Sequence, residues 1–252
     1  MIETDYIPDC LFPTDNQLEI PCLRLDRQPS VVDIPFVAFG EQARTFQMNG
    51  TGTLHFYVDD YRFNSVFEHP EKILKHHPRN IVEPNFSLFS ETPIAFGMQA
   101  IYKKRFIARA MQERGINVFV DLNVNSKFYQ LNMLGVPMGY SAFCTRGYSD
   151  RLHYLEFEYN IAKGCAGDNP LTFVIYGGGD KCKAFAREHG CIYINQMVNI
   201  KKKVSAIEKV AETVAFFGQP IDVETLLEDK KKEIIEEQLT DYSDNSILIS
   251  KS

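Results

Sequence analysis

Residues 171–189 read LTFVIYGGGDKCKAFAREH, an apolar run that ends in three glycines and continues into a polar, helix-forming segment. Such a run predicts a buried β-strand over 171–176, a turn over 177–179 and a helix over 180–189. The same order of strand, polar turn and helix recurs through residues 53–197. Alternating strands and helices are typical of an α/β fold built from parallel β/α units.

The other expected elements follow from the same pattern. Strands are predicted at 54–58, 80–84, 117–120, 139–144 and 191–194, and helices at 61–76, 92–114, 126–134 and 150–164. Pro93 suits the first turn of the long helix, and Gly115 suits its C-terminal cap. Six clear strands are too few for a closed eight-stranded barrel. Two architectures therefore stay open, an incomplete TIM-like barrel and an open parallel sheet.

The chain of 252 residues is expected to hold one core domain with additions at both ends. Residues 1–50 are rich in proline and predict an irregular N-terminal arm that packs on the core. Residues 51–200 form the predicted β/α core domain. Apolar residues at helical spacing predict a C-terminal extension of amphipathic helices over 201–240, which favours self-association, and 241–252 are expected to form a loosely ordered tail.

Composition narrows the class of protein. The formal net charge of −6 weakens the case for non-specific DNA binding through overall charge, although a local basic groove stays compatible with it. No apolar run reaches the roughly 18 residues of a membrane span, and the acidic N-terminus does not resemble a signal peptide. The six cysteines contain no CxxC pair. These features predict a cytoplasmic protein with reduced thiols and no membrane partner.

Several short motifs follow one another in an order and spacing that resemble a known family. They are FYVDDYRF at 56–63, HPEK at 69–72, EPNFS at 83–87, a long helix through Arg105, Gln112 and Gly115, GVPMG at 135–139 and YG at 176–177. Over residues 54–195 the chain is similar to the domain of unknown function 4417 family, whose members occur in bacteria, plasmids and phages. The resemblance implies a mobile-element context and favours DNA replication or phage biology. In that family an acid is common where this chain has Asn85.

Acidic and amide side chains follow two of the predicted strands. Asp59 and Asp60 follow the strand at 54–58, and Asp121 and Asn123 follow the strand at 117–120. Carboxyl ends of parallel strands meet at one edge of a sheet, where carboxylate oxygens can hold Mg²⁺ for phosphodiester cleavage. These four residues are the candidate catalytic groups, and Asp59 and Asp121 are the candidate metal ligands. Alternatively, Asp59 or Asp60 caps the next helix and the other pair satisfies backbone groups.

A second set of residues suits the binding of a phosphate or another ligand. Glycines at the start of a helix let backbone N–H groups approach a phosphate, although Asp180 at this turn favours a simple tight turn with that residue as the N-cap. An arginine at a strand end can bind a phosphate or carboxylate through two hydrogen bonds, or form a surface ion pair. The candidates are Asn85, Thr145, Arg146, Gly177, Gly178, Gly179 and Lys181. Arg105 and Arg109, beside Lys103-Lys104, are expected on a solvated helix face.

These observations favour a phage- or plasmid-associated protein that acts on nucleic acid, by binding DNA, in replication or by Mg²⁺-dependent cleavage. A β/α enzyme acting on a small phosphorylated or nucleotide ligand is one alternative. A non-catalytic protein-interaction module is the other.

Overall fold

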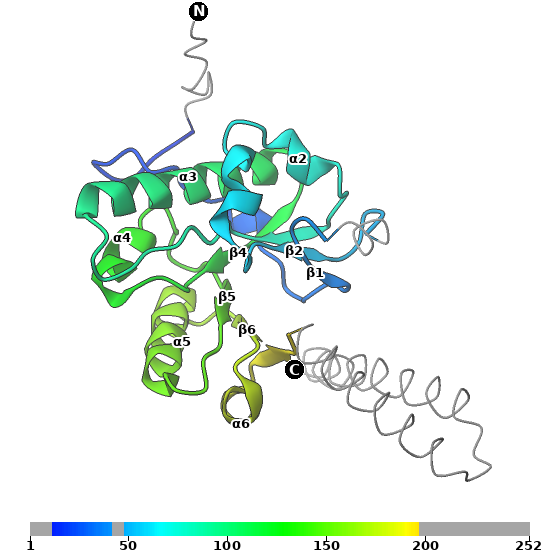
Figure 1. The fold of residues 1–252 in the computed structure, drawn as a ribbon, viewed down its shortest axis with the longest axis vertical. Coiled ribbons are helices and arrows are strands. Elements are labelled where there is room, and N and C mark those ends of the chain that lie inside the picture. The colour runs from blue at the N-terminus through cyan, green and yellow to red at the C-terminus, as the bar shows by residue number, and fades with distance from the viewer. Residues whose placement is uncertain (1–11, 42–47, 197–252) are drawn as a thin grey trace, which may run out of the picture. The chain divides into compact units, whose positions relative to one another are not determined.

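Seven parallel strands form a sheet in which each strand lies beside its predecessor in the chain (Figure 1). A computed structural model describes residues 12–41 and 48–196. The strands are β1 (Phe36–Ala38), β2 (Thr53–His55), β3 (Asn80–Val82), β4 (Asn117–Asp121), β5 (Ala142–Arg146), β6 (Thr172–Tyr176) and β7 (Ile192–Ile194). The predicted α/β class is confirmed. Because β1 and β7 are the two ends of the strand order, the sheet is open in the described residues.

The helical segments lie between the strands. They are η1 (Leu25–Arg27), η2 (Asp60–Arg62), η3 (Asn64–Val66), α2 (Glu71–Leu74), α3 (Ile94–Glu113), η4 (Ser126–Phe128), α4 (Tyr129–Asn132), α5 (Leu152–Ala166) and α6 (Gly179–His189). None of the described helices is long and apolar enough to cross a membrane. The helices predicted at 92–114, 150–164 and 180–189 are confirmed.

The chain divides into two compact units, which are described separately. Among the described residues, the first unit holds 12–41, 48–146 and 153–173, and the second holds 147–152 and 174–196. β1 falls within the predicted N-terminal arm but pairs in parallel with β2, so this part of the arm supplies a strand of the sheet. The C-terminal helices predicted over 201–240 and the tail over 241–252 lie outside the described residues.

The continuous helix expected over 61–76 is wrong, because the segment forms the short pieces η2, η3 and α2. Phe63 interrupts the helical path with φ −128° and ψ 4°. Its buried ring packs between those of Phe56 and Phe86, at centroid distances of 5.5 and 5.2 Å. The backbone conformation at Phe63, which ends the helical path, therefore follows from the burial of its ring between two aromatic neighbours. α2 then begins after Pro70, whose fixed φ suits a helix start.

α3 packs against β4, and one side of this helix is buried. Ile101, Lys104, Arg105, Ala108 and Gln112 recur at spacings of three and four residues, so they share this side. The expectation that Lys103-Lys104 and Arg105 lie on a solvated face is wrong for two of them. Lys104 is 2% exposed and Arg105 is 0% exposed, because carboxylates from the neighbouring strands compensate their charges.

In the second unit the end of β6 leads through a glycine turn into α6 and β7. Tyr176 accepts a hydrogen bond from the Gly147 N–H at 3.0 Å, and Ile194 accepts one from the Gly177 N–H at 2.8 Å. Gly178 is the N-cap of α6, so the expectation that Asp180 caps this helix is wrong. The main chain of this turn is therefore tied to both neighbouring segments.

Candidate functional site

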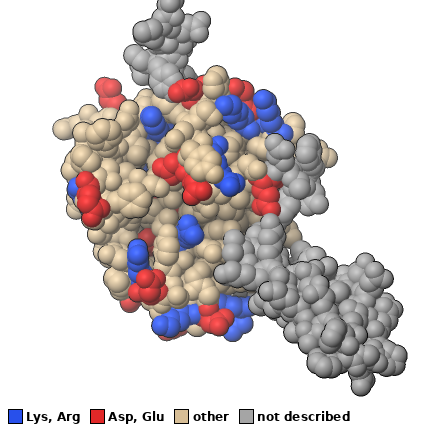
Figure 2. Space-filling view, in the orientation of Figure 1, with Lys and Arg blue, Asp and Glu red and all other residues tan. Residues whose placement is uncertain are grey.

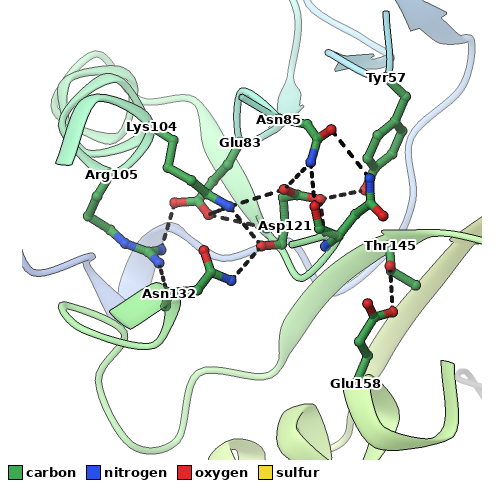
Figure 3. A network of polar contacts seen from close by, with 10 residues as sticks. Tyr57, Glu83, Asn85, Lys104, Arg105, Asp121, Asn132, Thr145 and Glu158 are labelled. Atoms are coloured by element: carbon green, nitrogen blue, oxygen red, sulfur yellow. Dashed lines mark hydrogen bonds and ion pairs between the residues drawn. The ribbon is translucent and has the colours of Figure 1, made fainter. Parts of the chain in front are cut away.

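The candidate site lies at the carboxyl edge of the first unit, which we define as the ends of β2 to β5 and the segment from each of these ends through the first two turns of the next helix. Asp121, the last residue of β4, is its centre and is fully buried (Figure 3). One carboxylate oxygen, Oδ1, accepts hydrogen bonds from the Tyr57 hydroxyl at 3.0 Å and from the Asn123 main-chain N–H at 3.1 Å. The other, Oδ2, accepts hydrogen bonds from Lys104 at 3.0 Å and Asn85 at 2.9 Å. Both carboxylate oxygens are thus occupied by donors.

Two buried acids face two buried cations in this network. Arg105 Nη1 lies 2.6 Å from Glu83 Oε1, and Lys104 Nζ lies 3.8 Å from Glu83 Oε2. Because Lys104 also pairs with Asp121, each charge has an opposite partner. Asn132 completes the network, since its side chain donates to the Asp121 carbonyl and its own carbonyl accepts from Arg105 (Figure 3). Buried charges persist only when they are compensated in this way, so we infer that the four ions form one structural unit.

Two asparagines cover the solvent side of Asp121. Asn85 and Asn123 are both half-buried. The Asn85 amide donates to Asp121 Oδ2 at 2.9 Å and to the Asn123 carbonyl at 2.7 Å, and its Oδ1 accepts from Asn123 Nδ2 at 3.3 Å. An acid at position 85 would place a further negative charge beside Asp121. An amide avoids that repulsion and donates two hydrogen bonds instead.

Glu158 lies on the buried side of α5 and, unlike Glu83 and Asp121, is a buried acid outside these ion pairs. It is 5% exposed, and no cation lies within ion-pair distance in the described part of the chain. Thr145 Oγ1 donates to its Oε2 at 2.7 Å, and the Tyr129 hydroxyl donates to its Oε1 at 3.3 Å. Burial, together with the negative charge of Asp121, raises the pKa of Glu158 to about 8. The group is therefore held largely as the neutral acid at neutral pH.

Two further buried groups lie beside Asp121. Cys144 is its register partner on β5, and the Tyr57 hydroxyl contacts both residues. Burial, followed by the neighbouring Cys144 and the Asp121 carboxylate, raises the pKa of Tyr57 well above its ordinary value. Burial likewise raises the pKa of the Cys144 thiol. Both groups stay protonated at neutral pH, so the thiol does not resemble the activated nucleophiles of cysteine enzymes.

The predicted acidic residues are only partly brought together. Asp121 and Asn123 lie in the network, whereas Asp59 is exposed and Asp60 is bound elsewhere. The Asp60 carboxylate accepts hydrogen bonds from the Ser87 N–H at 3.0 Å and the Ser87 hydroxyl at 2.9 Å. Asp59 is the N-cap of η2 without a side-chain capping bond.

The structure does not gather the ligands of a metal site around these acids. Within residues 12–41 and 48–196, no three His, Cys, Asp or Glu side chains are placed to hold a metal ion together. Both oxygens of the Asp121 carboxylate are bound by hydrogen-bond donors, one of which is the Lys104 cation. The assignment of Asp59 and Asp121 as Mg²⁺ ligands stays a prediction.

The predicted ligand-binding residues divide between the two units. Thr145 is fully buried and bound to Glu158, and Arg146 is half-buried at the end of β5. In the second unit a Cβ at Gly177 would lie 2.4 Å from the Gln196 side chain, and one at Gly178 would lie 2.4 Å from Cys182 Sγ. Close packing thus accounts for these two glycines. Gly179 has open space around its Cα and Lys181 is exposed, so a phosphate-binding role for this turn stays a prediction.

Several residues of the network were not among the predicted site residues. They are Tyr57, Glu83, Lys104, Arg105, Tyr129, Asn132, Cys144 and Glu158. A signal was present for two of them, because Lys104 and Arg105 stand between Ile101 and Ala108 on the side of α3 that carries apolar residues. Cations at such positions indicate buried carboxylates opposite them.

Exposed aromatic side chains lie in the segments that follow the strands of the first unit. Tyr61 lies in η2, Phe89 in the segment between β3 and α3, Phe96 in the first turn of α3, and Tyr154 and Phe157 on α5. All five follow the carboxyl end of a strand. The exposed aliphatic side chains include Leu25, Val31 and Met138, which precede the strands β1 and β5. Among the described residues, all the large aromatic side chains that are exposed therefore lie at the carboxyl edge.

Comparison with known proteins gives a family and two phage relatives. A family model described as "Domain of unknown function (DUF4417)" matches residues 12–186. The chain is 33% identical over 113 residues to "Gene 1 protein" of Mycobacterium phage D29, which is 42% of this chain and 40% of that protein. It is 27% identical over 175 residues to "Gene 1 protein" of Mycobacterium phage L5, covering 66% of this chain and 74% of that protein. The chain thus spans less than half the length of the first relative. No solved structure matches.

Proposed function

We propose that this chain, which belongs to the DUF4417 family and is related to phage proteins, binds nucleic acid at its carboxyl edge. The observation that carries the proposal is the placement of the exposed aromatic side chains. Phe89 is 63% exposed and Phe96 is 65% exposed, which costs the folded protein hydrophobic burial unless a ligand covers them. Aromatic rings on which bases stack are the common feature of proteins that bind single strands.

Hydrogen bonds link the segments that carry these rings. Asp60 joins η2 to the segment between β3 and α3 through Ser87. Lys127 Nζ donates to the Ser90 carbonyl at 3.2 Å and the Thr92 carbonyl at 2.7 Å, which joins the same segment to η4. The segments that carry Tyr61 and Phe89 are therefore joined to each other before a ligand arrives.

The charges of the carboxyl edge favour contacts to bases over contacts to phosphates. Arg62 and Lys127 are exposed here, but Asp59 and Glu91 are exposed as well. Figure 2 shows Lys and Arg side chains interspersed with Asp and Glu on the face that it presents. A protein that binds mainly through phosphates needs a basic stripe, and its affinity falls steeply with salt. Stacking on exposed rings requires no such stripe.

Fluorescence anisotropy with labelled oligonucleotides tests the proposal. Purified protein is titrated into single-stranded DNA, single-stranded RNA and duplex DNA, with and without Mg²⁺. Phe89→Ala and Phe96→Ala should each weaken binding roughly 5- to 100-fold, the range expected for loss of one stacked base. Met138→Ala, an exposed residue before β5, is the matched control and should leave the affinity unchanged. Wild-type protein that binds no oligonucleotide would refute the proposal.

Strand cleavage is a separate proposal and is tested in the same samples. Asp59, exposed, and Asp60, half-buried, are the accessible acids that directly follow β2 at the carboxyl edge. If they hold Mg²⁺ for cleavage, labelled DNA incubated with Mg²⁺ or Mn²⁺ should be shortened, and Asp59→Asn should abolish the product. Asp168→Asn, an exposed acid before β6, is the control. DNA that stays intact under all conditions would refute the cleavage proposal and leave the binding proposal standing.

A further inference from the structure

We infer that the side-chain amide of Asn123 binds the edge of an unpaired base in a single strand held at the carboxyl edge. The inference rests on the proposed function and specifies its ligand. It makes single-stranded nucleic acid, and not duplex, the partner of this surface, and it assigns a recognition role to one residue.

The network uses the main chain of Asn123 and leaves most of its side chain available. The main-chain N–H donates to Asp121 Oδ1 at 3.1 Å, and the carbonyl accepts from Asn85 Nδ2 at 2.7 Å. The side chain contributes one long bond, from Nδ2 to Asn85 Oδ1 at 3.3 Å. In the part of the chain that the structure describes, its second amide hydrogen and its Oδ1 have no partner. A half-buried amide therefore presents a donor and an acceptor side by side.

The main chain that carries this amide is held by Asn85 and by the buried ions next to it. The Asn85 amide donates to the Asn123 carbonyl and to the Asp121 carboxylate. The Lys104 ammonium in turn donates to the carboxylate and to the main-chain carbonyl of Asp121. Each of these supporting contacts is 3.0 Å or shorter. Because the main chain of Asn123 is held, only its side-chain torsions remain to be ordered when a ligand binds, which costs less conformational entropy than for an asparagine on an untethered loop.

The chemistry of a primary amide fits a base edge. An asparagine amide offers one donor and one acceptor at the spacing of two adjacent polar atoms on a base; in a duplex it can reach such a pair only from a groove, as at adenine N6 and N7, whereas in a single strand the Watson–Crick edge is open to it as well. In a single strand these edges are open and the bases can turn outward to stack on aromatic rings. In a duplex the pairing edges are occupied and the bases stack on one another. An amide with a free donor and acceptor, at the edge of the sheet that also carries exposed rings, therefore suits an unpaired base.

The test compares oligonucleotides of about twelve nucleotides made of dA, dT or dC with a duplex of the same length. Wild-type protein should bind at least one single strand about tenfold more tightly than the duplex, with a shallow dependence on salt. Asn123→Leu and Asn123→Ala should weaken the preferred strand by roughly 5- to 100-fold and reduce the differences among the three sequences. Asn160→Leu, an exposed asparagine on α5, is the control.

The outcomes separate this inference from the proposed function. Melting curves should be close to wild type for Asn123→Ala, because the main-chain bonds of the network are kept. If Phe89→Ala weakens binding while both Asn123 variants bind like wild type, nucleic-acid binding stands and the recognition role is refuted. Equal affinity for single strands and duplex would also overturn the inference. Wild-type protein that binds no oligonucleotide would refute both proposals.

Discussion

Replacement of Glu158 by Gln should change how the stability of this protein depends on pH. Glu158 is buried, has two hydroxyl donors and forms no ion pair among the described residues. Its pKa is about 8 in the folded protein, against an ordinary value of 4.5. Below pH 4.5 both the folded and the unfolded state carry the proton. As the pH rises towards 8 the unfolded chain releases it while the folded protein retains it, so the free energy of unfolding falls.

The size of the effect follows from linkage. Each unit of pKa difference corresponds to about 1.4 kcal/mol, so the wild-type protein should lose roughly 3 to 4 kcal/mol between about pH 5 and about pH 8 through this one group. Gln keeps the shape and one acceptor oxygen, and Thr145 or Tyr129 can accept from its amide because hydroxyl groups serve as donors and acceptors. The variant has no proton to release at this position and should lack this part of the pH dependence.

Urea unfolding at about pH 5 and about pH 8 measures the difference. Other titrating groups contribute equally to both proteins, so the stability of Glu158→Gln relative to wild type should rise by roughly 3 to 4 kcal/mol over this range. Glu156→Gln, an exposed residue of the same helix, should follow the wild-type curve. Parallel pH profiles for wild type and Glu158→Gln would refute the reasoning that burial without a cation holds this carboxyl neutral.

Two further predictions concern stability. Arg105→Met should destabilise the protein by about 3–5 kcal/mol, because it leaves the buried Glu83 carboxylate short of a cation, and the double variant with Glu83→Leu should recover part of the loss in urea unfolding. A single variant with wild-type stability would show that the pair is not charged. Gly97→Ala should destabilise by about 1–3 kcal/mol, since its Cβ would lie 2.1 Å from the Phe128 ring, whereas Gly164→Ala on α5 meets nothing within 4 Å and should stabilise by about 0.5–1 kcal/mol. Equal melting temperatures for these two glycine variants would contradict the packing argument.

The alternation of apolar strands and amphipathic helices was sufficient to predict the parallel α/β fold. The prediction succeeded because the apolar runs and the 3.6-residue period are local properties of the chain. The long helix over 92–114 also followed from local signals, as Pro93 and Gly115 mark its ends close to those of α3. The segment 61–76 failed for the opposite reason. Its path is decided by the burial of Phe63 between Phe56 and Phe86, which are distant in sequence from one another.

The candidate site shows the same division. From the sequence alone, Asp59, Asp60, Asp121 and Asn123 are expected to lie close together, because parallel strands share one carboxyl edge, and Asn85 is a separate ligand-binding candidate. In the structure Asp121 and Asn123 lie with Asn85 instead, and Asp60 is bound to Ser87. Only the tertiary structure decided that Lys104 neutralises Asp121 and that Glu158 has no cation beside it. The charge state of a carboxyl depends on burial and on partners brought from other elements, and neither is encoded in the spacing of residues along the chain.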